Sequence, residues 1–158
     1  QWAAMLDPET YIERAHHVKD TFRQQLNAKS LKYTYHESYV SVLEGVFARG
    51  DRRLSKVIYD AYKSGCIFDA WTDFFDNDKW MAAFEKNGID KEFYTTRERS
   101  EDELFPWDFI DIGVTKRFLL SEWKQAKRGV VTPNCREKCS GCGAAKFGGG
   151  VCFERGKE

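Results

Sequence analysis

The chain has 158 residues, of which 42% are hydrophobic and 32% charged. A chain of this length is typical of one domain, or of one domain with an appendage, and it buries about 70% of its unfolded surface. Lys plus Arg equals Asp plus Glu at 25 each, so net charge gives no reason to expect nucleic acid or an anionic membrane as a ligand. No run approaches eighteen apolar residues, so we expect no membrane-spanning helix.

The chain begins with Gln and shows no charged segment followed by an apolar one, which is the pattern of a secretory signal. We therefore expect a fragment of a longer, cytoplasmic protein. Four of the five cysteines cluster within the last two dozen residues. In a reducing compartment such clustering indicates a metal site more than disulfides.

Asp7-Pro8-Glu9 is a typical helix start, with an N-cap, a proline at the first helical position and an acid near the positive helix end. Apolar residues then recur at three- and four-residue steps and predict one helical face, namely Tyr11, Ala15, Val18, Phe22 and Leu26.

Residues Leu31 to His36 alternate apolar and polar side chains, which predicts a strand with one buried face. An isolated strand leaves its backbone groups unpaired on both edges. We therefore expect this strand at the edge of a sheet whose other strands lie outside the chain.

Three helices are predicted in the middle of the chain. Ser41 and Glu44 fit a capping box for a helix that ends near Gly50. Asp51 can cap the next helix, which Gly65 ends and whose predicted buried stripe is Leu54, Val57, Ile58, Ala61 and Tyr62. Residues 76–78 offer caps for a helix that carries Trp80, Met81 and Phe84 and ends at Gly88. Cys66 is expected to be a small buried hydrophobic residue.

The C-terminal third begins with a short helical turn at 90–93 and a solvated connector at 98–103. Residues 104–112 are apolar but interrupted by Pro106, so we expect an extended segment packed on the core. Phe118, Leu119, Trp123 and Ala126 predict a last helix from Thr115 to Gly129. The sequence thus predicts a mainly α (α+β) fold, with a mostly helical domain at 1–129 and a Cys-rich tail at 130–158.

The tail carries Cys135, Cys139, Cys142 and Cys152, with the spacing Cys-x3-Cys-x2-Cys-x9-Cys. It has six glycines and few large apolar groups, so we expect a metal ion to organise it. Four thiolates close a tetrahedral shell with no open position, which for zinc indicates a structural site. An iron–sulfur cluster suits four thiolates as well, and disulfides are the third alternative.

The first three cysteines also have the spacing of the cluster motif of radical S-adenosylmethionine (radical SAM) enzymes. That motif leaves one iron free and is followed by most of a barrel. Only sixteen residues follow Cys142 here, and Cys152 supplies a fourth ligand. We therefore do not assign these cysteines to a catalytic cluster.

Three arginines stand at one helix junction, Arg49, Arg52 and Arg53, and are candidates for a ligand or interface role because guanidinium groups bind carboxylate or phosphate bidentately. The alternative is a helix stop with solvated side chains. His36 is a candidate proton donor or acceptor, and the alternative is a structural, hydrogen-bonded histidine. Asp108 and Asp111 can form an acid/base pair or serve as turn residues.

Four stretches carry long ungapped similarity to one family: residues 43–54 (LEGVFARGDRRL), 65–71 (GCIFDAW), 105–114 (FPWDFIDIGV), and 120–135, from Leu-Ser-Glu-Trp through Thr-Pro-Asn-Cys. In them the chain resembles the C-terminal part of bacterial radical SAM proteins that carry an upstream cobalamin-binding-like domain. Gln1-Trp2 looks like the end of a Pro-Phe-Gln-Trp segment late in the barrel. The cysteine-rich tail is matched as well, although the insert at 144–151 is longer than the family pattern.

The resemblance implies that this chain is an accessory region without a catalytic centre of its own. The S-adenosylmethionine site, its [4Fe–4S] cluster and any cobalamin site would lie upstream, and the missing N-terminal barrel would be the partner of this region. The competing hypothesis is a non-enzymatic, zinc-stabilised module that binds RNA or protein, and a third is that the tail mediates dimerisation. The tail has a surplus of only two basic side chains.

Overall fold

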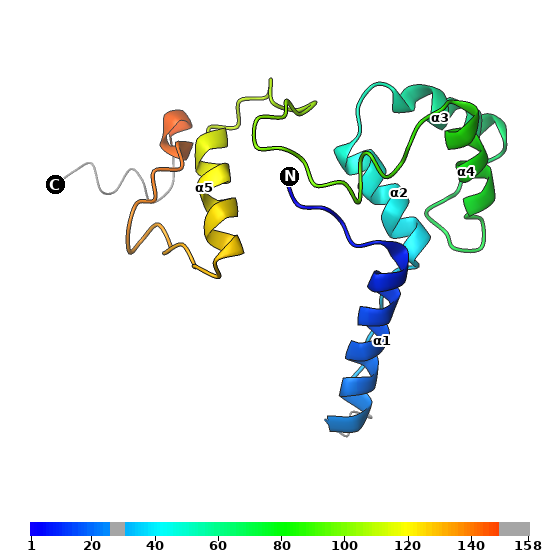
Figure 1. Cartoon of the computed structure of the whole chain (residues 1–158), viewed down its shortest axis with the longest axis horizontal. Coiled ribbons are helices and arrows are strands. Elements are labelled where there is room, and N and C mark those ends of the chain that lie inside the picture. Colours follow the sequence, from blue (N-terminus) through cyan, green and yellow to red (C-terminus); the bar gives the residue numbers. More distant parts are fainter. Residues whose placement is uncertain (26–30, 149–158) are drawn as a thin grey trace. The chain divides into compact units, whose positions relative to one another are not determined.

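The computed structural model describes residues 1–25 and 31–148, and this part of the chain is mainly helical, as predicted (Figure 1). It contains five α-helices and one short 3-10 helix. In chain order these are α1 (Pro8–Gln25), α2 (Ser38–Arg49), α3 (Leu54–Lys63), α4 (Asn77–Lys86), α5 (Lys116–Lys127) and η1 (Ala144–Phe147). Within the same residues there is no β-strand.

The chain divides into two compact units. The first consists of Gln1 and residues 3–99 and contains α1 to α4. The second consists of Trp2 and the chain from Ser100 onward, and it contains α5 and η1. The predicted domains, 1–129 and 130–158, stay a prediction, and the boundary between them falls inside the second unit.

The core of the first unit lies where α2, α3 and α4 meet. Its buried residues are Leu43, Val46, Leu54, Val57, Ala61, Cys66, Trp80, Ala83, Phe84 and Tyr94. The prediction that Cys66 is buried is confirmed. The predicted stripe on α3 is wrong at two of its five residues, because Ile58 and Tyr62 are exposed. The buried face of α3 is thus narrower than the apolar pattern suggests.

Most predicted helix ends are confirmed. The Asp7 carboxylate accepts the Thr10 amide at 2.9 Å, and the Asp76 carboxylate accepts the Lys79 amide at 3.2 Å. Helices α2 and α3 are the exceptions. Helix α2 begins at Ser38 rather than Ser41. Helix α3 begins at Leu54 without the predicted cap from Asp51, whose carboxylate accepts the Arg53 amide instead. Ser38 is itself buried, and no side chain caps the start of α2.

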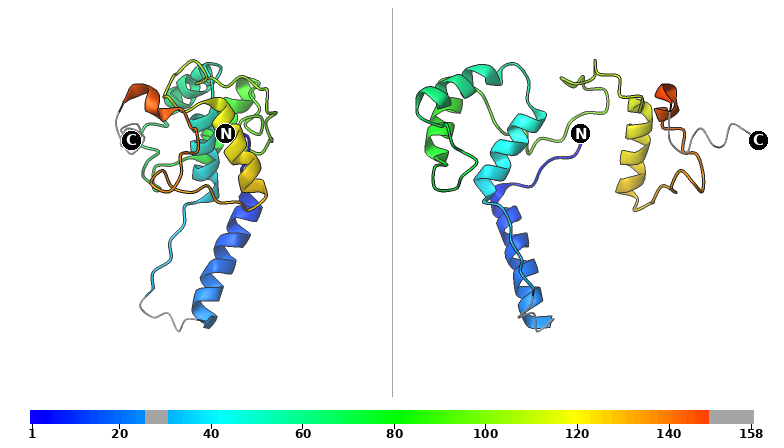
Figure 2. Two further views of the ribbon diagram at one scale, coloured as in Figure 1. Left: turned by 90° about the vertical axis from the view of Figure 1, so that its left-hand side faces the viewer. Right: turned by 180° about the vertical axis from the view of Figure 1, so that it is seen from behind.

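The predicted strand at Leu31 to His36 is wrong. The segment is extended but has no strand partner in the part of the chain that the structure describes, and it runs beside α1 (Figure 2). The ring of Tyr33 lies edge-on against Phe22 at 5.8 Å, and that of Tyr35 against His16 at 5.9 Å. The alternation thus does mark one packed face, but this face packs on a helix instead of in a sheet.

In the second unit, Thr115 caps α5, as predicted, by accepting the Phe118 amide at 3.2 Å. The expectation for residues 104–112 is mostly wrong, since Leu104, Phe109, Ile110 and Ile112 are exposed. Phe105 is buried, and its ring stacks on Trp107 at 5.3 Å and meets Trp2 edge-on at 6.1 Å. Residues 90–93 form turns without a helix.

Candidate functional site

The predicted metal ligands lie on the chain that follows α5. Cys135 and Cys139 are exposed, Cys142 is half-buried, and all three are free thiols. Cys152 lies outside the described residues. Among residues 1–25 and 31–148, no three His, Cys, Asp or Glu side chains are grouped so that they could hold a metal ion. The four-cysteine site therefore stays a prediction.

The turn from Cys139 to Ala144 has features of a thiolate knuckle. The Ala144 amide donates to the Cys142 sulfur at 3.4 Å, and amide–sulfur hydrogen bonds are the outer-shell contacts that stabilise thiolate ligands. Gly141 and Gly143 have φ angles of +68° and +98°, in the left-handed region where side chains are strained. These features are local to the turn, and metal binding by Cys139 and Cys142 stays a prediction.

The turn from Cys139 to Ala144 is anchored to the segment that precedes α5. The Thr115 amide donates to the Cys142 carbonyl at 2.9 Å, and Lys146 forms an ion pair with Asp111. A Cβ atom at Gly143 would lie 2.5 Å from the carbonyl oxygen of Gly113, so the two backbones are in direct contact. Asp108 and Asp111 each form an ion pair with a lysine of the same unit, Asp108 with Lys116 and Asp111 with Lys146. These ion pairs explain the two carboxylates without an acid/base role.

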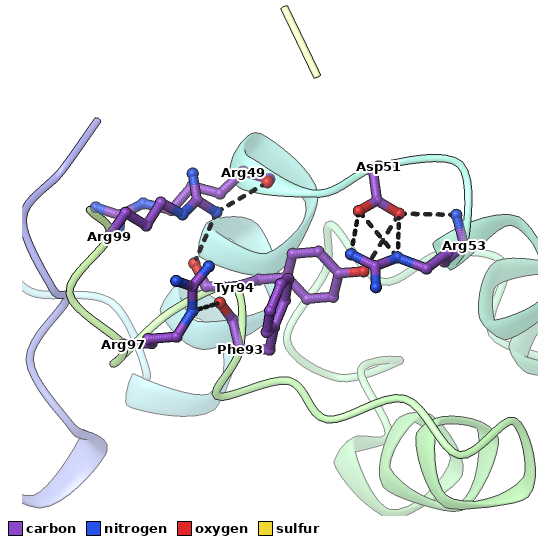
Figure 3. A network of polar contacts seen from close by, with 7 residues as sticks. All are labelled: Arg49, Asp51, Arg53, Phe93, Tyr94, Arg97 and Arg99. Atoms are coloured by element: carbon purple, nitrogen blue, oxygen red, sulfur yellow. Dashed lines mark hydrogen bonds and ion pairs between the residues drawn. The ribbon is translucent and has the colours of Figure 1, made fainter. Parts of the chain in front are cut away.

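Two of the three candidate arginines make internal contacts in the first unit (Figure 3). Arg49 Nη1 donates to the carbonyls of Ala3 at 2.8 Å and Thr95 at 3.3 Å, and so holds the N-terminal segment against the chain after α4. Burial lowers the pKa of Arg49. Arg52 is exposed on the turn before α3. Arg49 thus has a structural role, because it connects two segments of the first unit. A ligand role for Arg52 stays a prediction.

Arg53 binds Asp51 and stacks on aromatic rings. Its Nη2 and Nε atoms lie 2.6 Å and 3.1 Å from Asp51 Oδ2, and its guanidinium carbon lies 5.0 Å from the Phe93 ring centre. The hydrogen bonds from Arg53 lower the pKa of Asp51 to about 2. The Tyr94 hydroxyl also donates to this carboxylate, at 3.3 Å.

His36 lines a groove in the first unit, with a volume of about 690 Å³, between α2 and the loop before α4. Three carboxylates line the groove, those of Glu37, Glu44 and Asp69, and no Lys or Arg appears among the described residues that form its wall. Asp69 is fixed in place because Trp80 Nε1 donates to its Oδ1 at 3.2 Å. The groove is therefore acidic, and aromatic rings supply part of its wall.

Two features of the first unit escape the sequence analysis. Arg99 is buried, although its segment is predicted to be a solvated connector, and its Nη2 donates to the carbonyls of Arg49 at 3.1 Å and Tyr94 at 3.4 Å (Figure 3). The exposed rings of Phe68, Trp71 and Phe74 form a cluster on the α3–α4 loop. In the sequence of this loop, aspartates lie between the aromatic residues, and this pattern indicates that the rings are exposed rather than buried in a core.

No protein-family model, curated protein or solved structure matches the chain. In the described residues, no helix is both long enough and apolar enough to cross a bilayer.

Proposed function

We propose that this chain is the C-terminal accessory region of a cytoplasmic radical SAM protein. In that role it has no catalytic centre of its own, it covers or supports the upstream barrel, and its tail is organised by a structural four-cysteine site. Zinc is the ion that best suits four thiolates in a closed shell, and an iron–sulfur cluster is the alternative. The proposal rests on the ungapped sequence resemblance and on the geometry of the tail.

The observation that carries the metal site is the turn from Cys139 to Ala144. Cys139 and Cys142 are the two cysteines of the tail that are closest in sequence. Two glycines with left-handed φ angles and one amide–sulfur hydrogen bond lie at this pair, and both features suit a metal-binding turn. Cys135, Cys139, Cys142 and Cys152 would be the ligands. The ion would have a structural role, because the glycine-rich segment would fold around it, and it would take no part in catalysis.

The resembling segments 105–114 and 120–135 belong to the same unit as this turn. The tail contacts the first of them through Thr115, next to its end, and through Gly113. A docked, metal-stabilised tail fits an accessory role better than a separate binding module, because the tail is then part of the surface offered to the rest of the protein.

The reading frame that encodes the chain tests the proposed family directly. We expect the frame to continue upstream of Gln1 into a barrel that carries its own Cys-x3-Cys-x2-Cys motif, and the chain alone to show no S-adenosylmethionine cleavage under reducing conditions. A frame that begins at or just before Gln1, or that encodes an unrelated domain, would remove the proposal.

A further inference from the structure

The loop between α3 and α4 exposes large aromatic side chains that touch one another. The Phe68 ring lies 5.8 Å from that of Trp71 and 5.9 Å from that of Phe74. Their exposed fractions are 54%, 60% and 63%, and neighbouring Ile67 is 58% exposed. Contiguous apolar surface of this kind marks interaction sites, and Trp in particular dominates the binding energy of protein interfaces.

The same stretch of chain is strongly acidic. Residues 64–79 contain four aspartates, Asp69, Asp73, Asp76 and Asp78, and one lysine, Lys79, which pairs with Asp76 at 3.1 Å. A hollow of about 470 Å³ is lined by Phe68, Phe74, three aspartates and Lys79, so acidic side chains outnumber the basic one. Phe75 lines both this hollow and the groove of about 690 Å³ beside α2. The two hollows therefore share Phe75, and we call the residues that line them, together with Trp71, the acidic aromatic face.

This combination selects one class of partner. Phosphate groups would be repelled by the excess of carboxylates that line the two hollows, which disfavours nucleic acid. Guanidinium and ammonium groups are attracted both by carboxylates and by the faces of aromatic rings. A segment that carries only charge would leave the exposed rings uncovered, so the partner must bring apolar side chains as well.

We propose that the acidic aromatic face binds a basic amphipathic segment of a partner protein. Arg or Lys side chains of the segment lie in the groove among Glu37, Glu44 and Asp69, and its apolar side chains cover Phe68, Trp71 and Phe74. The aromatic cluster supplies most of the affinity, while the carboxylates set orientation and the rate of association. This inference does not depend on the metal site or on the proposed family.

A fluorescent peptide titration tests it, using the full chain and a 20-residue peptide with Leu at one helical face and Arg at the others. We expect saturable binding at 50 mM salt that weakens at 300 mM salt, and no binding of the same peptide with Glu in place of Arg. Trp71→Ala should raise the Kd about tenfold. Glu37→Gln with Glu44→Gln should also raise the Kd and reduce its salt dependence.

Phe109→Ala is the matched control, because Phe109 is an exposed ring of the other unit, and it should leave the Kd unchanged. All substituted side chains are exposed, so unchanged thermal unfolding verifies the fold. No binding at low salt, equal binding of the Glu peptide, or an equal effect of Phe109→Ala would overturn the proposal. So would self-association of the unmodified chain that Trp71→Ala abolishes, because the face would then be covered by a second copy.

Discussion

Arg53 binds Asp51 through both its backbone and its side chain. The Arg53 amide lies 2.9 Å from Asp51 Oδ1, and Nε lies 3.0 Å from the same oxygen, while Nη2 lies 2.6 Å from Oδ2. The carboxylate thus both stabilises the turn before α3 and fixes the guanidinium over the rings of Phe93 and Tyr94.

The Asp51–Arg53 pair predicts a component of acid unfolding. The pKa of Asp51 is lowered from 3.8 to about 2, so its contribution is complete above about pH 4 and is lost as the pH falls through 2. Since the Arg53 side chain is more than half exposed, we expect about 1 kcal/mol. Urea unfolding at pH 7, 4 and 2 should therefore show Asp51→Asn less stable at pH 7 and the difference gone near pH 2. A constant difference across this range would contradict the assignment.

Arg49→Gln should destabilise the first unit by about 1.5–3 kcal/mol, because two charge-assisted hydrogen bonds to the Ala3 and Thr95 carbonyls are lost. Arg52→Gln, three residues along the chain, is the matched control and should change stability by less than about 0.5 kcal/mol. Thermal unfolding of the two variants measures both effects. Equal effects would show that Arg49 does not hold the N-terminal segment.

Cys66 should resist thiol labelling in the folded chain. It is 7% exposed, and burial raises the pKa of its thiol, so little reactive thiolate is present at neutral pH. Iodoacetamide labelling followed by mass spectrometry should modify Cys135 and Cys139 in the presence of a chelator, and Cys66 only in urea. Rapid modification of Cys66 without denaturant would contradict its place in the core.

Gly143→Ala should release the tail from the segment before α5. The new Cβ would lie 2.5 Å from the Gly113 carbonyl oxygen, in addition to the strain of roughly 1–2 kcal/mol at a left-handed φ angle. Gly141→Ala has the same strain but no neighbour within 4 Å, and it is the matched control. Hydrogen exchange at the Thr115 amide, which donates to Cys142, should accelerate far more in Gly143→Ala. Similar exchange in both variants would mean that the backbone contact does not anchor the tail.

Local sequence signals predict most of the fold. Caps at Asp7, Asp76 and Thr115 and stops at Gly65 and Gly129 depend on the residue itself and its neighbours within one turn, so they can be read directly. The alternation at Leu31 to His36 is ambiguous because it records only which side is packed. Whether that side meets a sheet or α1 depends on residues outside the segment.

Tertiary context decides the rest. Ile58 and Tyr62 continue the apolar stripe of α3 but lie beyond the area that α4 covers, and Arg99 is buried within a run of charged residues. The tail gives a second example of contacts that the sequence does not predict. The spacing of the cysteines identifies four candidate thiolates, but it does not show how their sulfur atoms are arranged in space. The positive φ angles of Gly141 and Gly143 agree with the high glycine content of the tail, whereas the contact between Gly143 and Gly113 has no signal in the sequence.

Elemental analysis of the purified chain, with cobalt(II) substitution to count thiolates, tests the metal site most directly. We predict one zinc ion per chain, a cobalt spectrum with intense sulfur charge-transfer bands, and loss of the ion in Cys142→Ser but not in Cys66→Ala. A chain that binds neither metal, or a brown protein with iron and labile sulfide, would contradict the structural zinc site.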